Sequence, residues 1–294
     1  MQGKPTMAEV AAAFPQIRLE AEIGEGGFKI VYRAEVHGRV EAFKLARIPE
    51  DPADPTVSEN NRRRLSRELD LLMTCETPCL VRLGAFMPVE CRIGPYQYVG
   101  YSEELVAGEC LRNRIRAGHR PSQTELATLA ACLLSAVREL AAKNAIHRDV
   151  KPDNVMATGD AARPFVLLDL GVAFIVGGTN LTMDTHAIPG TRWYLAPEML
   201  DLDFRQSLDY RADLYTVGLT LYEYATGGNP FANPGDPPLT TMYRIKHQRV
   251  PPLHTLRRDL DSAFCALVDQ LIKKIPALRP GNVARLISQV EGCR

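Results

Sequence analysis

Residues 146–156 of the chain read IHRDVKPDNVM, and residues 167–171 read LLDLG. The first segment places the carboxylate of Asp149 two residues before the ammonium of Lys151. An acid beside a hydroxyl, with a lysine beside a phosphate, is the combination that transfer of a phosphate requires. We therefore interpret the segment as a candidate site for phosphate chemistry.

Two oxygen-bearing side chains follow these groups. Asn154 and Asp169 flank two short apolar runs, 154–157 and 165–168, which predict strands that bring these two side chains together. Amide and carboxylate oxygens are ligands that hard divalent cations prefer. Asn154 and Asp169 are therefore the predicted metal ligands.

The two halves of the chain differ in pattern. Up to about Val106, short β-rich runs alternate with turns, whereas the following half shows the spacing of buried helix faces. The predicted strands are 18–26, 29–36 and 39–46, and the predicted helices are 61–73, one that begins at Ser122 with Glu125 completing a capping box, 212–226, one from about Asp261 and one after Pro280. The Pro-rich, acidic stretch 49–60 is expected to be an exposed connection.

Two features of the β-rich half suit a nucleotide. Gly24, Gly26 and Gly27 lie between the first two predicted strands, where backbone N–H groups can approach a polyphosphate. A plain glycine hairpin is the alternative, and no Gly-Lys-Ser/Thr of a Walker loop follows.

Lys44 lies in an apolar strand and needs a partner, which Glu68 on the next predicted helix can supply. A surface salt bridge is the alternative interpretation of that pair.

The composition is that of an ordinary globular protein, with 294 residues, 46% of them hydrophobic, and a formal net charge of +0. This neutral balance gives no electrostatic reason to expect nucleic acid or an anionic membrane as a partner. No apolar stretch reaches the roughly 18 residues that cross a bilayer, and the first residues do not resemble a signal peptide. Seven cysteines, an odd number, favour reduced thiols, so we expect a cytoplasmic protein.

Further motifs follow in order: GTRWYLAPE at 190–198, DLYTVG at 213–218 and then Arg279. With the segments above, they make the chain resemble the eukaryotic-like (Hanks-type) serine/threonine protein kinases, in the manner of a bacterial stand-alone kinase domain. The resemblance implies an α+β, bilobal fold with ATP in a cleft, in which a small β-rich N-lobe carries one key helix and the C-lobe is larger and helical. The implied boundaries are a leader over 1–17, either mobile or packed on the small lobe, and a kinase domain over 18–294, with its N-lobe at about 18–105, its hinge at about 104–108 and its C-lobe at about 109–294.

The resemblance also implies roles for single residues. Lys44, fixed by Glu68, would hold the α and β phosphates of ATP. Asp149 would orient the substrate hydroxyl and accept its proton, Lys151 would stabilise charge at the γ-phosphate, and Thr191 would bond to both residues. The residues implied to bind the nucleotide are Ile23, Gly24, Gly26, Gly27, Val31, Ala42, Lys44, Glu104, Val106 and Met156. The implied ligands of magnesium, or of manganese, are Asn154 and Asp169.

Other motif residues have implied structural or regulatory roles. Glu198 is expected to pair with Arg279, and Asp213 is expected to brace the backbone of the loop that carries Asp149. Arg148 is expected to receive a phosphate from the activation segment, residues 169–198. The threonines that this segment offers for phosphorylation are Thr179, Thr182 and Thr185.

Three positions depart from the family pattern. Lys29 replaces the third glycine of the loop, where it either stiffens the loop, adds positive charge near phosphate or points to solvent. Leu170 replaces the usual Phe after the metal-binding Asp. Ser102 or Glu103 occupies the position before the hinge that normally holds an apolar residue or Thr, and a carboxylate there is unfavourable beside adenine.

We expect an active serine/threonine protein kinase that phosphorylates itself and protein substrates, because Lys151 and Thr191 resemble the Ser/Thr branch rather than the tyrosine kinases. The alternative from another class is a nucleotide-binding pseudokinase scaffold, which Lys29 and the departure at 102–103 suggest. A small-molecule phosphotransferase is a third hypothesis, which the LAPE sequence at 195–198 disfavours because such enzymes generally lack this segment.

Overall fold

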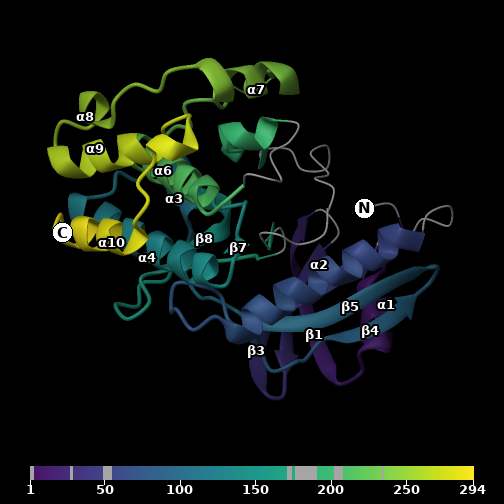
Figure 1. The fold of residues 1–294 in the computed structure, drawn as a ribbon. Helices are drawn as coiled ribbons and strands as arrows, with labels where there is room; N and C mark the ends of the chain where they lie inside the picture. Colours follow the sequence, from purple (N-terminus) through teal and green to yellow (C-terminus); the bar gives the residue numbers. More distant parts are fainter. Residues whose placement is uncertain are drawn as a thin grey trace. The chain divides into compact units, whose positions relative to one another are not determined.

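The computed structural model describes residues 3–26, 29–48, 55–170, 174–175, 191–201, 208–233 and 235–294 (Figure 1). The chain forms two compact units. The first runs to Thr74 and resumes over Val81–Val106, and the second holds Cys75–Leu80 and nearly all the rest of the chain from Ala107 onward. No helix in the described part of the chain is both long enough and apolar enough to cross a membrane.

The first unit contains a five-stranded antiparallel sheet with the strand order β1-β2-β3-β5-β4. Its strands are β1 (Ile17–Gly26), β2 (Lys29–Val36), β3 (Arg39–Ile48), β4 (Val89–Ile93) and β5 (Tyr96–Glu104). The turn between β2 and β3 places His37 at φ 48° and Gly38 at φ 77°, the backbone conformation of a type I′ hairpin. The three strands predicted from the sequence are therefore confirmed, and β4 and β5 complete the sheet.

One face of this sheet is an apolar core covered by the N-terminal helix α1 (Met7–Ala13). Phe14 follows α1 and packs edge-on against Phe43, with the ring centroids 5.0 Å apart. Gly100 of β5 leaves room for this ring, because a Cβ at that position would lie 2.5 Å from a carbon atom of Phe14. Of the two alternatives for the leader, packing on the small unit therefore holds for α1 and Phe14.

Helix α2 (Pro55–Thr74) packs on β3. Leu65, Glu68, Leu69 and Leu72 are buried at helical spacing, so one stripe of α2 faces the sheet. The helix begins six residues before the predicted 61–73, within the stretch expected to be an exposed connection. Composition misled the prediction because proline disrupts helix interiors but suits a first helical turn, where its missing N–H has no partner to lose.

The second unit is mainly helical. Its helices are α3 (Leu111–Arg116), α4 (Gln123–Ala142), α6 (Arg211–Thr226), α7 (Pro238–His247), α8 (Leu253–Leu256), α9 (Ser262–Leu271) and α10 (Val283–Glu291), with 3₁₀ turns η1 (Pro152–Asn154), η2 (Thr191–Tyr194), η3 (Pro197–Leu200) and η4 (Pro276–Leu278). Its short strands are β6 (Glu109–Cys110), β7 (Ala145–Ile146), β8 (Val155–Ala157), β9 (Phe165–Leu167) and β10 (Phe174–Ile175), which form the sheets β6-β8-β9 and β10-β7. The helices predicted at 212–226, at 261 and after Pro280 are confirmed by α6, α9 and α10.

Helix α6 is buried almost all round, which explains its apolar sequence. It ends at Gly227, whose φ of 83° is the left-handed conformation that glycine adopts without strain. The predicted capping box of α4 forms only in part. The Ser122 side chain accepts a hydrogen bond from the backbone N–H of Glu125, but the Glu125 carboxylate accepts one from the Tyr224 hydroxyl at 2.6 Å.

The segment Cys75–Leu80 belongs to the second unit although the chain on both sides of it belongs to the first. The carboxylate of Glu139 on α4 accepts hydrogen bonds from the backbone N–H groups of Glu76 and Thr77, at 2.5 and 2.7 Å. The guanidinium of Arg163 donates to the carbonyl oxygen of Pro78 at 2.9 Å. These bonds explain why residues 75–80 belong to the second unit, although the sequence predicted a single division near residue 105.

Candidate active site

The loop that carries the IHRDVKPDN sequence is held by Asp213, from the buried helix α6. The Asp213 carboxylate accepts hydrogen bonds from the backbone N–H groups of His147 and Arg148, at 2.7 and 2.8 Å. Arg148 has a φ of 69°, so the chain turns sharply at this point. Burial raises the pKa of Asp213 to about 6, against the lowering effect of the two N–H donors. The predicted bracing role of Asp213 is confirmed.

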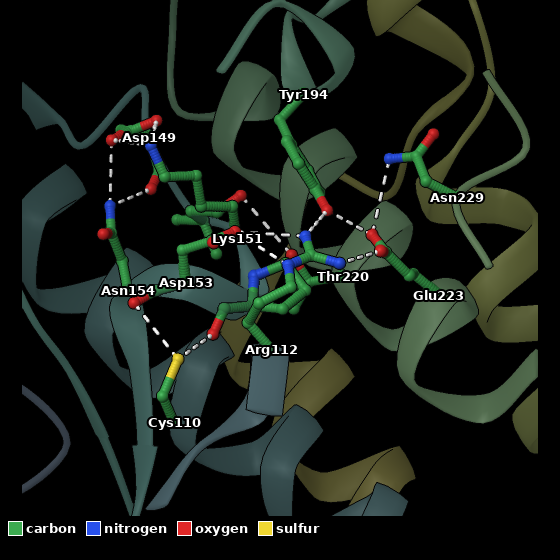
Figure 2. A network of polar contacts seen from close by, with 12 residues as sticks. Cys110, Arg112, Asp149, Lys151, Asp153, Asn154, Tyr194, Thr220, Glu223 and Asn229 are labelled. Atoms are coloured by element: carbon green, nitrogen blue, oxygen red, sulfur yellow. Dashed lines mark hydrogen bonds and ion pairs between the residues drawn. The ribbon is translucent and has the colours of Figure 1, made fainter. Parts of the chain in front are cut away.

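Asp149 lies at the centre of the polar contacts in this loop (Figure 2). The Lys151 ammonium donates to its two carboxylate oxygens at 2.9 and 2.7 Å, and the Asn154 side-chain amide donates to Oδ2 at 2.9 Å. Asp149 is buried, and burial raises its pKa to about 6 although Lys151 and Asn154 lower it. The structure therefore brings together the three groups that the sequence predicted for this loop, around a carboxylate that is charged at neutral pH.

His147 is a functional neighbour that the sequence analysis left without a role. It is fully buried, and burial lowers its pKa to about 4, so its ring is neutral at physiological pH. Its Nδ1 accepts a hydrogen bond from the backbone N–H of Asp149 at 3.3 Å. The ring therefore helps to orient the backbone at Asp149 without placing a second charge beside it.

The predicted metal ligands lie at neighbouring strand ends. Val155 of β8 pairs with Leu167 of β9, and the backbone N–H of Leu168 donates to the carbonyl oxygen of Asn154 at 2.7 Å. The Asp169 charge raises the pKa of Asp149, which places the two carboxylates within electrostatic reach of each other.

These residues fit a hard cation. Asn154 uses its amide nitrogen on Asp149, so its side-chain oxygen is the atom that suits a cation, as do the Asp169 carboxylate oxygens. In the described part of the chain no three His, Cys, Asp or Glu side chains could hold a metal ion together. This donor set matches magnesium, which typically binds through one or two protein groups together with substrate phosphates.

The predicted nucleotide-binding residues of the first unit lie on neighbouring strands. Gly24 of β1 is opposite Val31 of β2, Val31 is opposite Lys44 of β3, and Ala42 of β3 is opposite Glu103 of β5. The remaining members of the predicted set in this unit that the structure describes are Ile23, Gly26, Glu104 and Val106. In the second unit, Met156 of β8 is opposite Cys110 of β6. Each unit thus holds its own part of the predicted set.

The pairing of Lys44 with Glu68 stays a prediction, and the structure places another carboxylate beside Lys44. Lys44 Nζ lies 2.7 Å from a carboxylate oxygen of Glu103. Glu68 accepts from the Lys29 ammonium at 2.5 Å and from the Tyr101 hydroxyl at 2.9 Å. Two lysines and two glutamates therefore share this region of the first unit.

The alternation of side chains along β5 distinguishes the two candidates for the position before the hinge. Glu103 is opposite Ala42, two residues from Lys44, and its side chain reaches Lys44. Ser102 points to the other face, where its hydroxyl donates to the Glu41 carboxylate at 2.5 Å. Of the two candidates, Glu103 is therefore the one on the face of Lys44, and burial raises its pKa although Lys44 lowers it.

Arg112 of α3 links three parts of the second unit, a contact that the sequence analysis missed (Figure 2). Its guanidinium donates to the Asp153 carboxylate at 3.0 and 3.1 Å, to the Glu223 carboxylate and to the Tyr194 hydroxyl. Tyr194 also donates to Glu223. The turn η1 beside Asp149, the turn η2 and helix α6 are therefore joined through one side chain.

The predicted pair of Glu198 and Arg279 is confirmed. The two guanidinium nitrogens of Arg279 donate to the two carboxylate oxygens of Glu198, at 2.6 and 2.8 Å. Arg279 also donates to the carbonyl oxygens of Lys273 and Arg211, both at 2.8 Å. This fully buried guanidinium thus anchors the turn η3 to α6 and to the chain after α9.

Some predicted residues lie outside the described residues: Gly27 of the glycine-rich loop and the three candidate phosphorylation sites Thr179, Thr182 and Thr185. Thr191 begins the turn η2, but its side chain is outside the description. Leu170, at the position of the usual Phe, is fully buried, so its apolar side chain packs in the interior.

A two-unit fold with a β-rich first part, together with an acid, a lysine and an asparagine on one loop, defines a class of phosphate-transferring proteins. Comparison with known families agrees with this. Residues 17–290 match the family described as the protein kinase domain. The chain therefore belongs to the protein kinase family.

Individual relatives are bacterial kinases. The chain is 32% identical over 221 residues to serine/threonine-protein kinase PknB of Mycobacterium leprae, an alignment that covers 74% of this chain and 33% of PknB. It is 29% identical over 267 residues to PknE of Mycobacterium tuberculosis, covering 90% of this chain and 43% of PknE. It is 26% identical over 272 residues to a probable serine/threonine-protein kinase of Clostridium perfringens, covering 92% and 37%. The chain thus spans less than half the length of these relatives.

Proposed function

We propose that this chain is an active serine/threonine protein kinase that transfers the γ-phosphate of ATP to hydroxyl groups of protein substrates. The observation that carries the proposal is the buried Asp149 carboxylate, which is held by Lys151 and Asn154 on a loop braced by Asp213. A carboxylate with a pKa of about 6 is charged at neutral pH and can accept a proton from a hydroxyl.

Each residue would have a distinct task. Asp149 would orient the hydroxyl and take its proton, and Lys151 would offset the negative charge that develops during transfer. Asn154 and Asp169 would hold magnesium, which when bound neutralises charge on the phosphates. Lys151 and Thr191, and the printed names of the relatives, support Ser/Thr rather than Tyr as the acceptor.

The test is magnesium-dependent transfer of labelled phosphate from ATP to a general protein acceptor. Asp149→Asn should lower the rate by about a thousandfold or more, because it removes the proton acceptor. Asp160→Asn is the matched control, since this exposed carboxylate of the same unit lies in the loop between β8 and β9. Equal rates for the wild-type chain and Asp149→Asn, both folded, would contradict the proposal.

A nucleotide-binding scaffold is the second candidate, because Lys44 lies 2.7 Å from Glu103, a carboxylate at a position where the family pattern has an apolar residue or Thr. A scaffold binds nucleotide without turning it over. Formation of ADP from ATP by the wild-type chain, lost in Asp149→Asn, separates the two candidates. A parallel comparison of protein and aminoglycoside acceptors tests the choice of a protein substrate, which the LAPE segment with its Glu198–Arg279 pair supports.

We also propose that the activity is controlled by autophosphorylation in the activation segment. A phosphate on Thr179, Thr182 or Thr185 would bring about two negative charges and strong acceptors to the Arg148 guanidinium, next to Asp149. The protein would act in the cytoplasm, where reducing conditions keep its seven cysteines as thiols. Fractionation of cells that produce the tagged protein tests this location.

A further inference from the structure

Two thiols of the second unit are in contact with each other. The side chains of Cys79 and Cys132 hydrogen-bond to each other, and both are free thiols. Cys79 belongs to the segment Cys75–Leu80, and Cys132 belongs to helix α4. The tasks proposed above for Asp149 and its neighbours use neither of them. The pair is therefore a nucleophilic feature that the proposed function leaves unassigned.

Hydrogen bonds between the segment and α4 explain why the two thiols meet. The Glu139 carboxylate on α4 accepts from the backbone N–H groups of Glu76 and Thr77, at 2.5 and 2.7 Å. Cys132 precedes Glu139 by seven residues, which is two helical turns, so both side chains lie on the same face of α4. The segment is thus bonded to one face of α4 at Glu139 and contacts the same face again where Cys79 reaches Cys132.

Strand β9 holds both cysteines as well. The carbonyl oxygen of Cys79 accepts from the backbone N–H of Leu167 at 2.8 Å, and Leu80 forms a parallel bridge with the same residue. Helix α4 packs on β9, where Cys132 accepts a hydrogen bond from the backbone N–H of Phe165. The backbone therefore fixes the two cysteines beside each other, independently of the contact between their sulfur atoms.

The two thiols differ in how readily they ionise. The hydrogen bond with Cys132 lowers the pKa of Cys79, although burial raises it. The Thr77 hydroxyl and the Arg163 guanidinium lower the pKa of Cys79 further, whereas the Glu139 carboxylate raises it. The same thiol–thiol hydrogen bond, together with burial, raises the pKa of Cys132. The half-buried thiol is thus the one that ionises, and the buried thiol lies in place to react with it.

Cys75, four residues before Cys79, provides a comparison within the same segment. It is half-buried, as Cys79 is, but burial raises its pKa to about 11, and the Glu139 charge raises it as well. A thiol with this pKa is almost entirely protonated at neutral pH and reacts slowly. The segment therefore contains one thiol suited to nucleophilic attack and one that is not.

We propose that Cys79 and Cys132 form an oxidation site, at which a hydroperoxide converts the two thiols into a reversible disulfide. The Cys79 thiolate attacks a peroxide oxygen, so that an S–O bond forms and the O–O bond breaks, giving a sulfenic acid and hydroxide. The Cys132 sulfur then attacks the Cys79 sulfur, so that the S–S bond forms and the S–O bond breaks. The hydroxyl group leaves as water with the proton of Cys132. Two thiols thus lose two electrons and two protons, and hydrogen peroxide becomes two molecules of water.

The disulfide would join the segment Cys75–Leu80 covalently to α4, next to β9, the strand that leads to Asp169. A small thiol such as glutathione would reduce it again, so in a reducing compartment the bond would last only while the oxidant is present. The inference does not depend on the proposed kinase function, because the reaction needs no nucleotide.

The first test is treatment of the whole, reduced chain with a small excess of hydrogen peroxide, followed by alkylation of the remaining thiols. Intact mass should show that the number of alkylated thiols falls from seven to five. Digestion with trypsin without reductant should give a linked pair of peptides, 68–82 and 117–138, which contain the two cysteines. Dithiothreitol should restore all seven thiols. An unchanged number of thiols, or a link between other peptides, would overturn the inference.

Single variants assign the two roles. Cys79→Ser should abolish the link and leave Cys132 unmodified, because that thiol is buried and its pKa is raised. Cys132→Ser should stop the reaction at a sulfenic acid on Cys79, which dimedone traps as a stable adduct. Circular dichroism checks that each variant is folded. If Cys132→Ser is unfolded, Cys132→Ala takes its place, since Ala suits this buried helix position.

Cys75→Ser is the matched control, because peptide 68–82 contains both Cys75 and Cys79. This variant should form the disulfide as fast as the wild-type chain does. A link that persists in Cys79→Ser and disappears in Cys75→Ser would assign the reaction to Cys75 and overturn the inference. In the reduced wild-type chain at neutral pH, iodoacetamide should alkylate Cys79 about tenfold or more faster than Cys75. Equal rates would contradict the role of Cys79 as the attacking thiol. Phosphate transfer that depends on Asp149 is measured separately, so neither result decides the other.

Discussion

The Lys151 ammonium donates to both carboxylate oxygens of Asp149, at 2.9 and 2.7 Å, and both side chains are buried. Burial of Asp149 disfavours its charged form and Lys151 favours it, and the balance leaves the pKa of Asp149 raised to about 6. The ability of Asp149 to accept a proton therefore depends on pH in the range just below neutrality.

A pH profile of kcat/KM should show this titration. Below pH 6 Asp149 is protonated and cannot accept the hydroxyl proton, so kcat/KM should fall about tenfold for each unit of pH. Above pH 6 the rate should reach a plateau. Lys151→Met should shift this acidic limb to higher pH, since the charge that lowers the pKa of Asp149 is gone, and it should also lower the plateau. Lys273→Met, an exposed lysine of the same unit, should leave the limb in place.

Loss of the Glu198 charge should destabilise the second unit. Glu198→Gln leaves the fully buried Arg279 guanidinium without its charged partner, and we expect a loss of about 3 kcal/mol in the free energy of unfolding. Urea unfolding followed by circular dichroism measures it. Glu291→Gln, in the exposed pair with Arg294, should change stability by less than about 0.5 kcal/mol. Equal stabilities of the two variants would show that the buried pair contributes no more to the free energy of unfolding than the exposed pair does.

The N-terminal helix should contribute to the stability of the first unit. Phe14→Ala removes a fully buried ring that contacts Phe43 and Phe86, so we expect a loss of about 3 kcal/mol or more. Met7→Ala, in the helix α1 that Phe14 follows but 45% exposed, should have little effect. If Phe14→Ala unfolded at the same urea concentration as the wild-type chain, the packing of residues 7–14 would not contribute to the free energy of unfolding.

Phosphorylation of the activation segment should activate the protein. We expect incubation with magnesium and ATP to add phosphate at one or more of Thr179, Thr182 and Thr185, detected by intact mass and peptide mapping. Replacement of all three by Ala should slow the enzyme without abolishing activity, and Arg148→Ala should have a similar effect. Full activity without phosphate in this segment, unaffected by both changes, would mean that other contacts order it.

Thr191 is expected to act differently from these three threonines. Thr191→Ala should lower kcat even in protein that is fully phosphorylated, because its hydroxyl is expected to bond with Asp149 and Lys151 rather than to carry a regulatory phosphate. Thr191→Ser, which keeps the hydroxyl, should retain most of the activity. An Ala variant that is as active as the Ser variant would remove Thr191 from the catalytic set.

The sequence by itself predicted the arrangement around Asp149, because the groups concerned are neighbours in the chain. Asp149, Lys151 and Asn154 lie within six residues, so a short turn of the backbone can bring their side chains together. The long helix 212–226 and the first three strands were also predictable, since their periodicity is a local property. The partners Glu198 and Arg279 are far apart in sequence and could be paired only through the family resemblance.

The contacts of Lys44 with Glu103 and of Lys29 with Glu68 were decided only by tertiary structure. Sequence shows that a buried lysine needs a carboxylate, but it does not show which carboxylates the fold brings to it. That choice depends on the register of β3 against β5, which places Glu103 on the face of Lys44, and on the first residue of β2, which turns Lys29 toward Glu68. Ion pairs form between whichever charges the backbone brings within a few ångströms, and a one-residue change of register would have turned Ser102 to that face in place of Glu103.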